Sequence, residues 1–408
     1  MKKTKHLILI IFLLVSIKCT TNNSSKLSVS TILMDSEYLM KSKIRLKKDD
    51  PQLKVAFNHL LENAEAALKE GPFSVTDKEK LPPSGDKHDY ASYSRYWWPD
   101  PDKPDGLPFI RRDGETNPNS QSLKKSDRQR IGALGANTET LGLAYYFTEE
   151  EKYANKVAEL LRVWFLDKET RMNPNVNHAQ CRPGHNLGSK SGVLDGRLMI
   201  QAFESSLLIA GSLALTNTEL EQLKEWAGVY FEWLTTNEMA LKEADSKNNH
   251  GSFYDLQALY FSLYAGNLKA STQIAQEFSQ RRILSQIELD GSMPEEIART
   301  RPLFYSIYNL HAMFLVANLA KKVDVNVWNG EDKDSRLRMA LDFLVPYTDP
   351  KIPWPSPTIG NADRMKMYII LQMADQAYPD GNYLKIAEKL SSERRNLEQS
   401  NLVFPLMR

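Results

Sequence analysis

Amphipathic stretches with helical spacing make up most of the chain. In residues 53–69, apolar side chains recur at every third or fourth position until Gly71 and Pro72 end the pattern. Comparable stretches cover residues 135–148, 151–166, 198–215, 218–236, 252–265, 269–288, 302–321, 335–345, 362–377 and 382–396. Strand-like alternation is scarce, so the sequence predicts an all-α protein. Helical hairpins that recur at intervals of about 35–50 residues would stack around an axis as an α/α solenoid or toroid.

Two long irregular segments interrupt this helical pattern. Residues 72–134 and 167–196 are rich in proline and glycine, and the first is also rich in arginine and aromatic residues. Loops of that length are uncommon inside a compact domain and are usually functional. Gathered at one end of the helices, they would build a cleft. No stretch between residues 50 and 400 reads as a linker, so we predict one domain over residues 51–400.

The overall composition excludes several classes of protein. Of the 408 residues, 42% are hydrophobic and 25% are charged, which suits a large buried core and not a disordered chain. The 52 basic and 51 acidic residues give a net charge of +1, which offers no electrostatic footprint for nucleic acid. Two cysteines exclude a disulfide scaffold and a Cys-rich zinc module. Sequence motifs for nucleotide binding, a serine nucleophile elbow or a zinc protease are also absent.

The N-terminus is typical of an export signal. Residues 1–18 hold three early lysines and then an apolar run of about nine residues, too short to span a bilayer. Cys19 follows, as in a bacterial lipoprotein signal, although Lys18 departs from the usual small residue there. We expect a lipoprotein-type signal peptide over residues 1–18, a lipidated Cys19, and a tether and N-terminal segment over residues 19–50. The alternative is an ordinary secretory signal. Either one predicts an exported protein, periplasmic or anchored at the outer membrane.

Three potential metal ligands lie close together in the second irregular segment. His178, Cys181 and His185 fall within eight residues of sequence. Pro183 and Gly184 break any helix between them, and no fourth ligand stands at zinc spacing. We therefore predict a structural loop there, and no metal.

Aromatic and arginine side chains are interleaved in the first irregular segment. Trp97 and Trp98 are adjacent, and Arg111 and Arg112 follow shortly after. Aromatic rings stack on the C–H faces of sugars, and guanidinium groups hold carboxylates. These four residues are therefore candidates for binding a uronate-containing glycan. The alternative is that the rings fill the core of the domain.

Two further motifs carry polar groups at predicted helix starts. The first is Asn248-Asn249-His250, which sets amide donors beside a titratable imidazole. A simple capped turn would explain Asn248 but does not need His250.

The second motif places Arg299 and Arg301 before a helix that carries Tyr305 and, one turn later, Tyr308. Arginine at a helix N-terminus does not complement the helix dipole, which makes a purely structural role less satisfying. The alternative is two surface arginines and two core tyrosines.

Together these motifs resemble the alginate lyase superfamily of helical-toroid polysaccharide lyases. The resemblance rests on Arg-x-Arg-x-x-x-Tyr-x-x-Tyr, on Asn-Asn-His, on the Tyr-Trp-Trp-Pro loop and on the segment 164–174. It implies an (α/α) toroid, that is, an incomplete barrel of helical hairpins with long loops lining a central cleft. It further implies an enzyme that cleaves an anionic polysaccharide by β-elimination, without a metal or an organic cofactor. Any contact with a membrane would be made only through the N-terminal lipid.

The resemblance also assigns roles to residues. Elimination removes the proton at C5, builds charge on the uronate carboxylate and expels O4, so preorganised donors must meet that charge. Asn249 and Arg299 are implied to neutralise the carboxylate, with Arg301 as a near substitute. Tyr305 is implied to act as base, acid or both. Because the ordinary pKa of tyrosine is about 10, the base role needs a nearby cation. His250 would help to hold the carboxylate or act as a base on the opposite face of the sugar.

Other details stay open at the level of sequence. His185, Asn186 and Tyr308 are further candidates for contacts with the substrate. One tyrosine in both roles suits syn elimination, as from mannuronate, whereas a His/Tyr pair suits anti elimination. We expect mannuronate-rich alginate as the substrate, with glucuronan next.

Two alternatives keep the fold and change the function. A toroid glycoside hydrolase needs two carboxylates about 5–9 Å apart, for which Glu295 and Glu296 are candidates, although adjacent residues diverge on a helix. A non-catalytic surface lipoprotein that only binds glycan would need the aromatic loop alone.

Bulk charge cannot attract the proposed polyanion. Residues 1–18 contain four lysines and no acid, so their removal leaves 48 basic against 51 acidic residues. The attraction must therefore be local. We expect it to come from arginines around one site, namely Arg95, Arg111, Arg112, Arg299 and Arg301.

Overall fold

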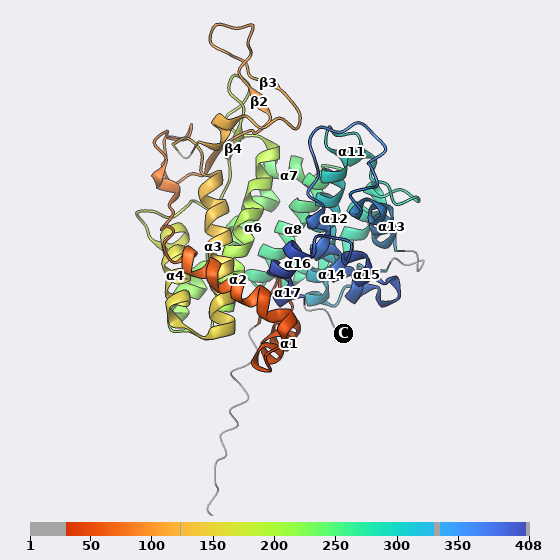
Figure 1. The fold of residues 1–408 in the computed structure, drawn as a ribbon. Coiled ribbons are helices and arrows are strands. Elements are labelled where there is room, and N and C mark those ends of the chain that lie inside the picture. The colour runs from red at the N-terminus through yellow and green to blue at the C-terminus, as the bar shows by residue number, and fades with distance from the viewer. Residues whose placement is uncertain (1–29, 123, 330–334, 405–408) are drawn as a thin grey trace, which may run out of the picture.

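The computed structural model describes residues 30–122, 124–329 and 335–404. The expected signal peptide, Cys19 and the first part of the expected tether lie outside these residues. The described chain is a set of packed helices with a long irregular region at one end, where β2 and β3 project, and α1 at the opposite end (Figure 1). The helices are α1 (Ser36–Lys47), α2 (Pro51–Ala67), α3 (Arg128–Thr148), α4 (Glu151–Leu161), α5 (Ile200–Leu208), α6 (Asn217–Thr236), α7 (Glu238–Ala244), α8 (Asn249–Tyr264), α9 (Leu268–Phe278), α10 (Leu284–Gln286), α11 (Pro294–Ile297), α12 (Pro302–Ala320), α13 (Arg336–Leu344), α14 (Met367–Ala377), α15 (Tyr383–Ala387), α16 (Ser392–Leu397) and α17 (Ser400–Val403).

An inner row of helices organises the fold. Helices α3, α5, α8, α12 and α14 contact one another in succession. Helices α4, α6, α9 and α13 pack behind them, each against one or two members of the inner row. The C-terminal helices α16 and α17 contact α2, so the two ends of the described chain meet. This is the hairpin arrangement of an (α/α) toroid, as predicted.

Local signals explain where several helices begin. Asp50 caps α2, whose first residue is Pro51, a favourable first position because proline has no N–H to satisfy. Thr216 and Glu219 form a reciprocal capping box at the start of α6. Pro302 opens α12 in the same way as Pro51 opens α2. These boundaries lie within a few residues of those expected from the sequence.

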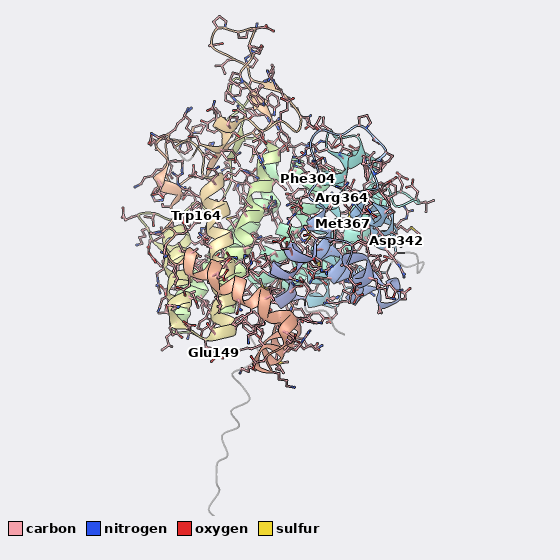
Figure 2. All side chains as sticks on the ribbon, in the orientation of Figure 1. Glu149, Trp164, Phe304, Asp342, Arg364 and Met367 are labelled. Atoms are coloured by element: carbon pink, nitrogen blue, oxygen red, sulfur yellow. The ribbon has the colours of Figure 1, made fainter. Side chains whose placement is uncertain are left out.

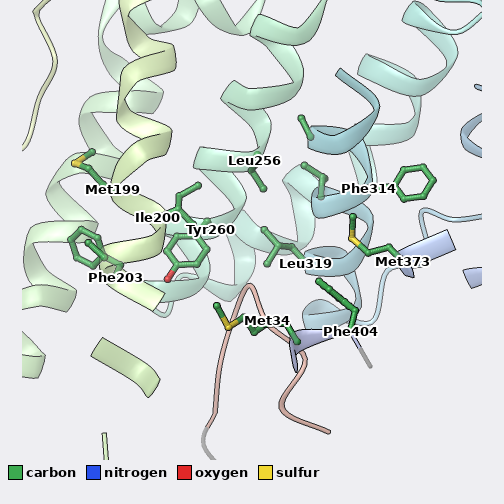
Figure 3. Close-up of a cluster of buried hydrophobic side chains, with 14 of the residues drawn as sticks. Met34, Met199, Ile200, Phe203, Leu256, Tyr260, Phe314, Leu319, Met373 and Phe404 are labelled. Carbon is green, nitrogen blue, oxygen red and sulfur yellow. The ribbon is translucent and has the colours of Figure 1, made fainter. Parts of the chain in front are cut away.

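Helices α8 and α12 form the centre of the core. Both are buried on nearly all sides, which is typical of a core helix and not of a surface one. By length and composition α12 could span a membrane, but most of it is buried within the fold. Figure 3 shows how Tyr260 of α8 and Leu319 of α12 meet apolar side chains from both ends of the described chain, Met34 and Phe404. Figure 2 shows side chains filling the space between the helices throughout the molecule.

The two irregular segments pair with each other. Strand β1 (Ala91–Tyr93) of the first segment runs parallel to β4 (His178–Cys181) of the second. Within the first segment, β2 (Trp97–Trp98) runs antiparallel to β3 (Ile110–Arg111). Below β1, the buried Asp195 accepts hydrogen bonds from Tyr90 (3.0 Å) and Ser92 (2.6 Å) and pairs with Arg128 of α3. The irregular segments are therefore fastened to the helical body by buried polar groups.

Three details differ from the expected helix boundaries. The first irregular segment ends at Asp127, not at residue 134, because α3 begins seven residues earlier. A helix, α7, lies between α6 and α8 where no separate helix was expected. The stretch 382–396 is broken into α15 and α16. Residues 30–50 contain α1, which packs on α2 and α17.

Candidate active site

The N-terminal ends of α8 and α12 lie side by side, with the short helix α11 between them in the sequence. Asn249 is the first residue of α8, and its side-chain nitrogen lies 3.0 and 2.9 Å from the two carboxylate oxygens of Glu296 in α11. The backbone N–H of Asn249 also donates to Glu296. Both side chains are almost fully buried. The Asn-Asn-His motif is thus attached to the segment that carries Arg299 and Tyr305.

His250 is oriented by a buried acid. Its Nδ1 is hydrogen-bonded to the carboxylate of Glu243 in α7. Because a carboxylate accepts the bond, Nδ1 carries the proton and Nε2 is the nitrogen left for another partner. The imidazole side chain is 22% exposed, whereas that of Glu243 is 1% exposed. His250 is therefore held from within the fold and remains accessible from outside it.

Arg299 lies over the ring of Tyr305. The guanidinium carbon is 3.8 Å from the ring centroid, a cation–π contact. Asp113 fixes this guanidinium through Nη2 at 2.9 Å and Nε at 3.2 Å. Asp113 also accepts from the Thr300 hydroxyl (3.0 Å) and from Arg111 (2.7 Å). The first irregular segment thus reaches the start of α12 through one carboxylate.

Tyr305 is protonated in the resting site. Its hydroxyl donates to that of Tyr96 at 2.9 Å, and the side chain is 6% exposed. Burial raises the pKa of Tyr305 above its ordinary value, and the hydrogen bond to Tyr96 adds to the increase, although the charge of Arg299 opposes it. The expected cation is present beside the tyrosine, but desolvation outweighs it.

Of the two candidate arginines, the structure brings only Arg299 to Tyr305. Arg301 lies over the ring of Phe304 at 4.8 Å and donates to the carbonyl of Asn361 at 3.4 Å. Tyr308, one turn after Tyr305, is half-buried and stacks on Phe304 at 5.8 Å.

Three more arginines surround these tyrosines. Arg197 lies 5.5 Å from the ring centroid of Tyr308, and its buried Nε has no hydrogen-bond partner among the described residues. The buried Nε of Arg95 is also unpartnered, and burial, followed by the charge of Arg128, lowers the pKa of that guanidinium. Sequence reasoning had named Arg95 for its place among aromatic residues. Arg128, which lies inside the expected irregular segment 72–134, and Arg197 were not singled out in the sequence.

The aromatic pair lies among the irregular segments. The ring of Trp97 contacts that of His185 at 4.8 Å, and Trp98 donates to the carbonyl of Glu115 at 3.1 Å. Arg112 lies over Trp98 at 5.2 Å, so it supports that ring. Both tryptophans are half-buried and neither belongs to the hydrophobic core.

His185 and Asn186 brace a turn of the second irregular segment. His185 Nε2 is 2.7 Å from the carbonyl of Phe109, and Asn186 pairs with Arg182. A hollow of about 560 Å³ is lined by both residues, and a smaller one of about 260 Å³ by Trp97. The contacts of these predicted residues thus lie within the irregular segments, apart from the group around Tyr305.

The three potential metal ligands turn to separate partners. His178 Nδ1 lies 3.2 Å from the carbonyl of Leu187, Cys181 donates to the carbonyl of Asn186, and His185 contacts a different carbonyl. Within residues 30–122, 124–329 and 335–404, no group of three or more His, Cys, Asp or Glu side chains is placed to hold a metal ion.

The fold and the site together define a class of protein. A helical toroid that sets an amide, an imidazole, an arginine and a tyrosine at the adjoining ends of its inner helices is built like a polysaccharide lyase of the (α/α)-toroid type. Comparisons with known proteins agree. The family model described as alginate lyase matches residues 74–354, and the chain belongs to the alginate lyase family. The resemblance, the toroid fold and the class of enzyme, a polysaccharide lyase, are thereby confirmed.

Solved structures give the same result. An alginate lyase from Bacteroides ovatus is 38% identical, with a TM-score of 0.87 over 93% of this chain and 100% of that one. Alginate lyase A1-III from Sphingomonas species A1 is 14% identical, with a TM-score of 0.56 over 87% of this chain and 95% of that one. A variant of A1-III in complex with a tetrasaccharide has a TM-score of 0.60 at 13% identity, over 93% and 98% of the two chains. At these lower identities the likeness concerns the fold. No curated protein sequence matches the chain.

Proposed function

We propose that the protein cleaves alginate, with a preference for mannuronate-rich polymer, by β-elimination at Tyr305. The observation that carries the proposal is the position of Tyr305 under Arg299, at the end of α12 that adjoins Asn249. Membership of the alginate lyase family supports the substrate class. The name of the Bacteroides ovatus relative and the tetrasaccharide complex of A1-III point to the same kind of polymer.

Each group then has a task in the reaction. Asn249, Arg299 and His250 bind the uronate carboxylate, where negative charge builds as the C5 proton leaves; for this, His250 carries a proton on Nε2 as well as on Nδ1. Because Tyr305 is protonated in the free site, it must first release its hydroxyl proton to solvent, a step that the charge of Arg299 favours, and the resulting phenolate then takes the C5 proton. As the double bond between C4 and C5 forms and the C4–O4 bond breaks, Tyr305 returns the proton to O4. One residue in both roles is syn elimination, which suits mannuronate. It suits glucuronan equally, because the two sugars share their configuration at C4 and C5.

The geometry disfavours a hydrolase. Glu295 is exposed, whereas Glu296 is fully buried and bonded to Asn249. The two carboxyl groups therefore diverge and do not flank a common bond, which hydrolysis requires.

One experiment separates these functions. The protein is incubated with mannuronan, guluronan and glucuronan while near-ultraviolet absorbance from unsaturated uronate ends is followed. We expect absorbance to rise fastest with mannuronan. New reducing ends without that absorbance would mean hydrolysis. If neither signal appears, the protein only binds the glycan.

We further propose that Cys19 is lipidated and anchors the exported protein at the outer membrane. The signal-like residues 1–18 support this proposal. In Figure 1, α1 lies at the opposite end of the molecule from β2 and β3, so an anchor before α1 would leave the irregular segments facing outward. Cys19→Ser should move the protein from the membrane fraction to the soluble fraction. Unchanged fractionation, or a mature mass without lipid, would contradict the proposal.

A further inference from the structure

Glu296 differs from the other buried acids near the candidate site. Asp113 pairs with Arg299, Glu243 with His250 and Asp195 with Arg128. For Glu296 the structure shows no ion pair within the described residues. Its side-chain hydrogen bonds come from the N–H and the side-chain amide of Asn249. This acid is therefore fully buried against an amide and has no cation of its own.

The contacts of Glu296 determine the direction of the Asn249 side chain. Both carboxylate oxygens lie within 3.0 Å of the Asn249 side-chain nitrogen. Glu296 is itself held in α11, where its N–H donates to Met293 and its carbonyl accepts from Arg299. The amide of Asn249 is therefore held against Glu296, and the protonation state of Glu296 decides which end of the amide faces it: the nitrogen faces an ionised carboxylate, and the oxygen faces a protonated one.

A bound uronate would place a second carboxylate on this same amide. Two carboxylates that share one site disfavour each other's charge strongly, unless a cation lies between them. Arg299 and His250, which would bind the uronate, each pair with another acid, Asp113 and Glu243, and neither forms an ion pair with Glu296 among the described residues. An amide has a donor end and an acceptor end, so the nitrogen of Asn249 can turn to the uronate while its oxygen accepts from a carboxylic acid. A neutral Glu296 places no second negative charge beside the uronate and donates a hydrogen bond to the side-chain oxygen of Asn249.

We propose that Glu296 is a positioning residue whose neutral, protonated form holds Asn249, so that binding of the uronate is coupled to proton uptake by Glu296. This inference rests on the proposed function, because it assumes that Asn249 meets the substrate carboxylate.

The electrostatics of the resting site support the inference. Burial raises the pKa of Glu296 to about 7, while Asn249, Arg299 and His250 act in the opposite direction. Of the other acids nearby, Glu243 is bonded to His250, and the neighbouring Glu295 on α11 is exposed. A bound carboxylate would raise the pKa of Glu296 further. At neutral pH the free protein therefore holds Glu296 only partly protonated, and binding of a carboxylate shifts Glu296 toward its protonated form.

The first test is a pH profile of kcat/KM on mannuronan for wild type and E296Q, since glutamine imitates the protonated acid. The ratio of E296Q to wild type should rise about tenfold between pH 6 and pH 8, because a group with a pKa of about 7 is about one-tenth protonated at pH 8. E296D, which shortens the side chain, should lose about 10- to 100-fold at every pH, mainly in KM. E295Q, at the exposed neighbour, is the matched control and should follow the wild-type profile. A ratio that does not change with pH would overturn the inference.

The second test measures proton uptake directly. Y305F is titrated with mannuronate oligosaccharides at pH 7 in buffers of different ionisation enthalpy. We expect uptake of about half a proton per site in Y305F and a clear decrease in the double variant Y305F/E296Q. Equal uptake in both would overturn the inference.

An infrared difference spectrum of Y305F needs no substitution at Glu296. It should gain a carboxylic-acid band when the oligosaccharide binds, and a spectrum without this band would contradict protonation. If wild type makes product but these readouts fail, only this inference falls. If there is neither product nor binding, the proposed function falls with it.

Discussion

At the scale of single residues, the candidate site depends on acids that orient its basic and amide groups. Glu243 holds His250, Glu296 holds Asn249 and Asp113 holds Arg299. The sequence revealed the oriented groups but not these partners, because a buried acid looks the same in the sequence as an exposed one. Asp113 stood inside a motif that was noted for its arginines, and it proved to be the residue that joins that motif to α12.

Asp113→Asn tests this contact. Burial alone would raise the pKa of Asp113, but the hydrogen bonds and charge of Arg299 bring it to about 2. A lowered pKa means that the carboxylate stabilises the fold above the unfolded pKa of about 4, and that this contribution is lost as the pH falls toward 2. We expect D113N to lower the free energy of unfolding at pH 7 by about 1–2 kcal/mol, and to lower kcat because Arg299 is no longer fixed. Urea unfolding and initial rates measure both effects.

Wild-type stability and activity in D113N would contradict this role. A stability difference that stayed constant between pH 4 and pH 2 would also contradict it.

At the scale of elements, the helices were far easier to predict than the site. Their apolar spacing and their proline and capping signals are local, so most boundaries were predicted within a few residues. The convergence of the ends of α8 and α12 is a tertiary effect that no local pattern contains. The sequence also could not distinguish Arg299 from Arg301, because both precede Pro302 and only packing decides which one lies over Tyr305.

The turn after Asp113 offers a test at this scale. Gly114 has φ of +80°, and a Cβ there would lie 2.7 Å from both Ile359 and Thr300. Gly114→Ala should therefore displace the first irregular segment from α12 and lower activity, with a loss of stability of about 1–3 kcal/mol. Gly85→Ala is the matched control, because Gly85 has φ of +78° but nothing within 4 Å of the added carbon. Equal effects of the two substitutions on activity would show that backbone strain, and not the contact, is responsible.

At the scale of the whole molecule, a hollow of about 410 Å³ is lined by side chains of α3, α12 and α14 and of both ends of the described chain, and some of these side chains are ionisable. Its lining includes Glu139 of α3, His311 of α12 and Lys366 before α14. Burial, aided by the charge of Glu204, raises the pKa of Glu139 to about 7. Burial also lowers the pKa of His311 to about 4, and within the part of the chain that the structure describes its Nε2 has no hydrogen-bond partner. Burial thus favours the neutral form of both groups.

The substitution Glu139→Gln tests whether burial keeps Glu139 protonated. A carboxyl whose folded pKa lies above its unfolded value favours the folded state at low pH, and that advantage is lost as the pH rises from about 4.5 through 7. Relative to wild type, E139Q should therefore gain about 1–2 kcal/mol in the free energy of unfolding between pH 5 and pH 8. Denaturant unfolding at both pH values measures the change. The same difference at both would show that Glu139 is not held protonated.

The most direct test of the central claim is the formation of unsaturated uronate from mannuronan by wild type and by Tyr305→Phe. The substitution removes one hydroxyl and keeps the ring under Arg299. The account predicts rising near-ultraviolet absorbance with wild type and a loss of at least about 100-fold with Y305F, while binding of mannuronate oligosaccharides persists. Full activity of folded Y305F would contradict the account.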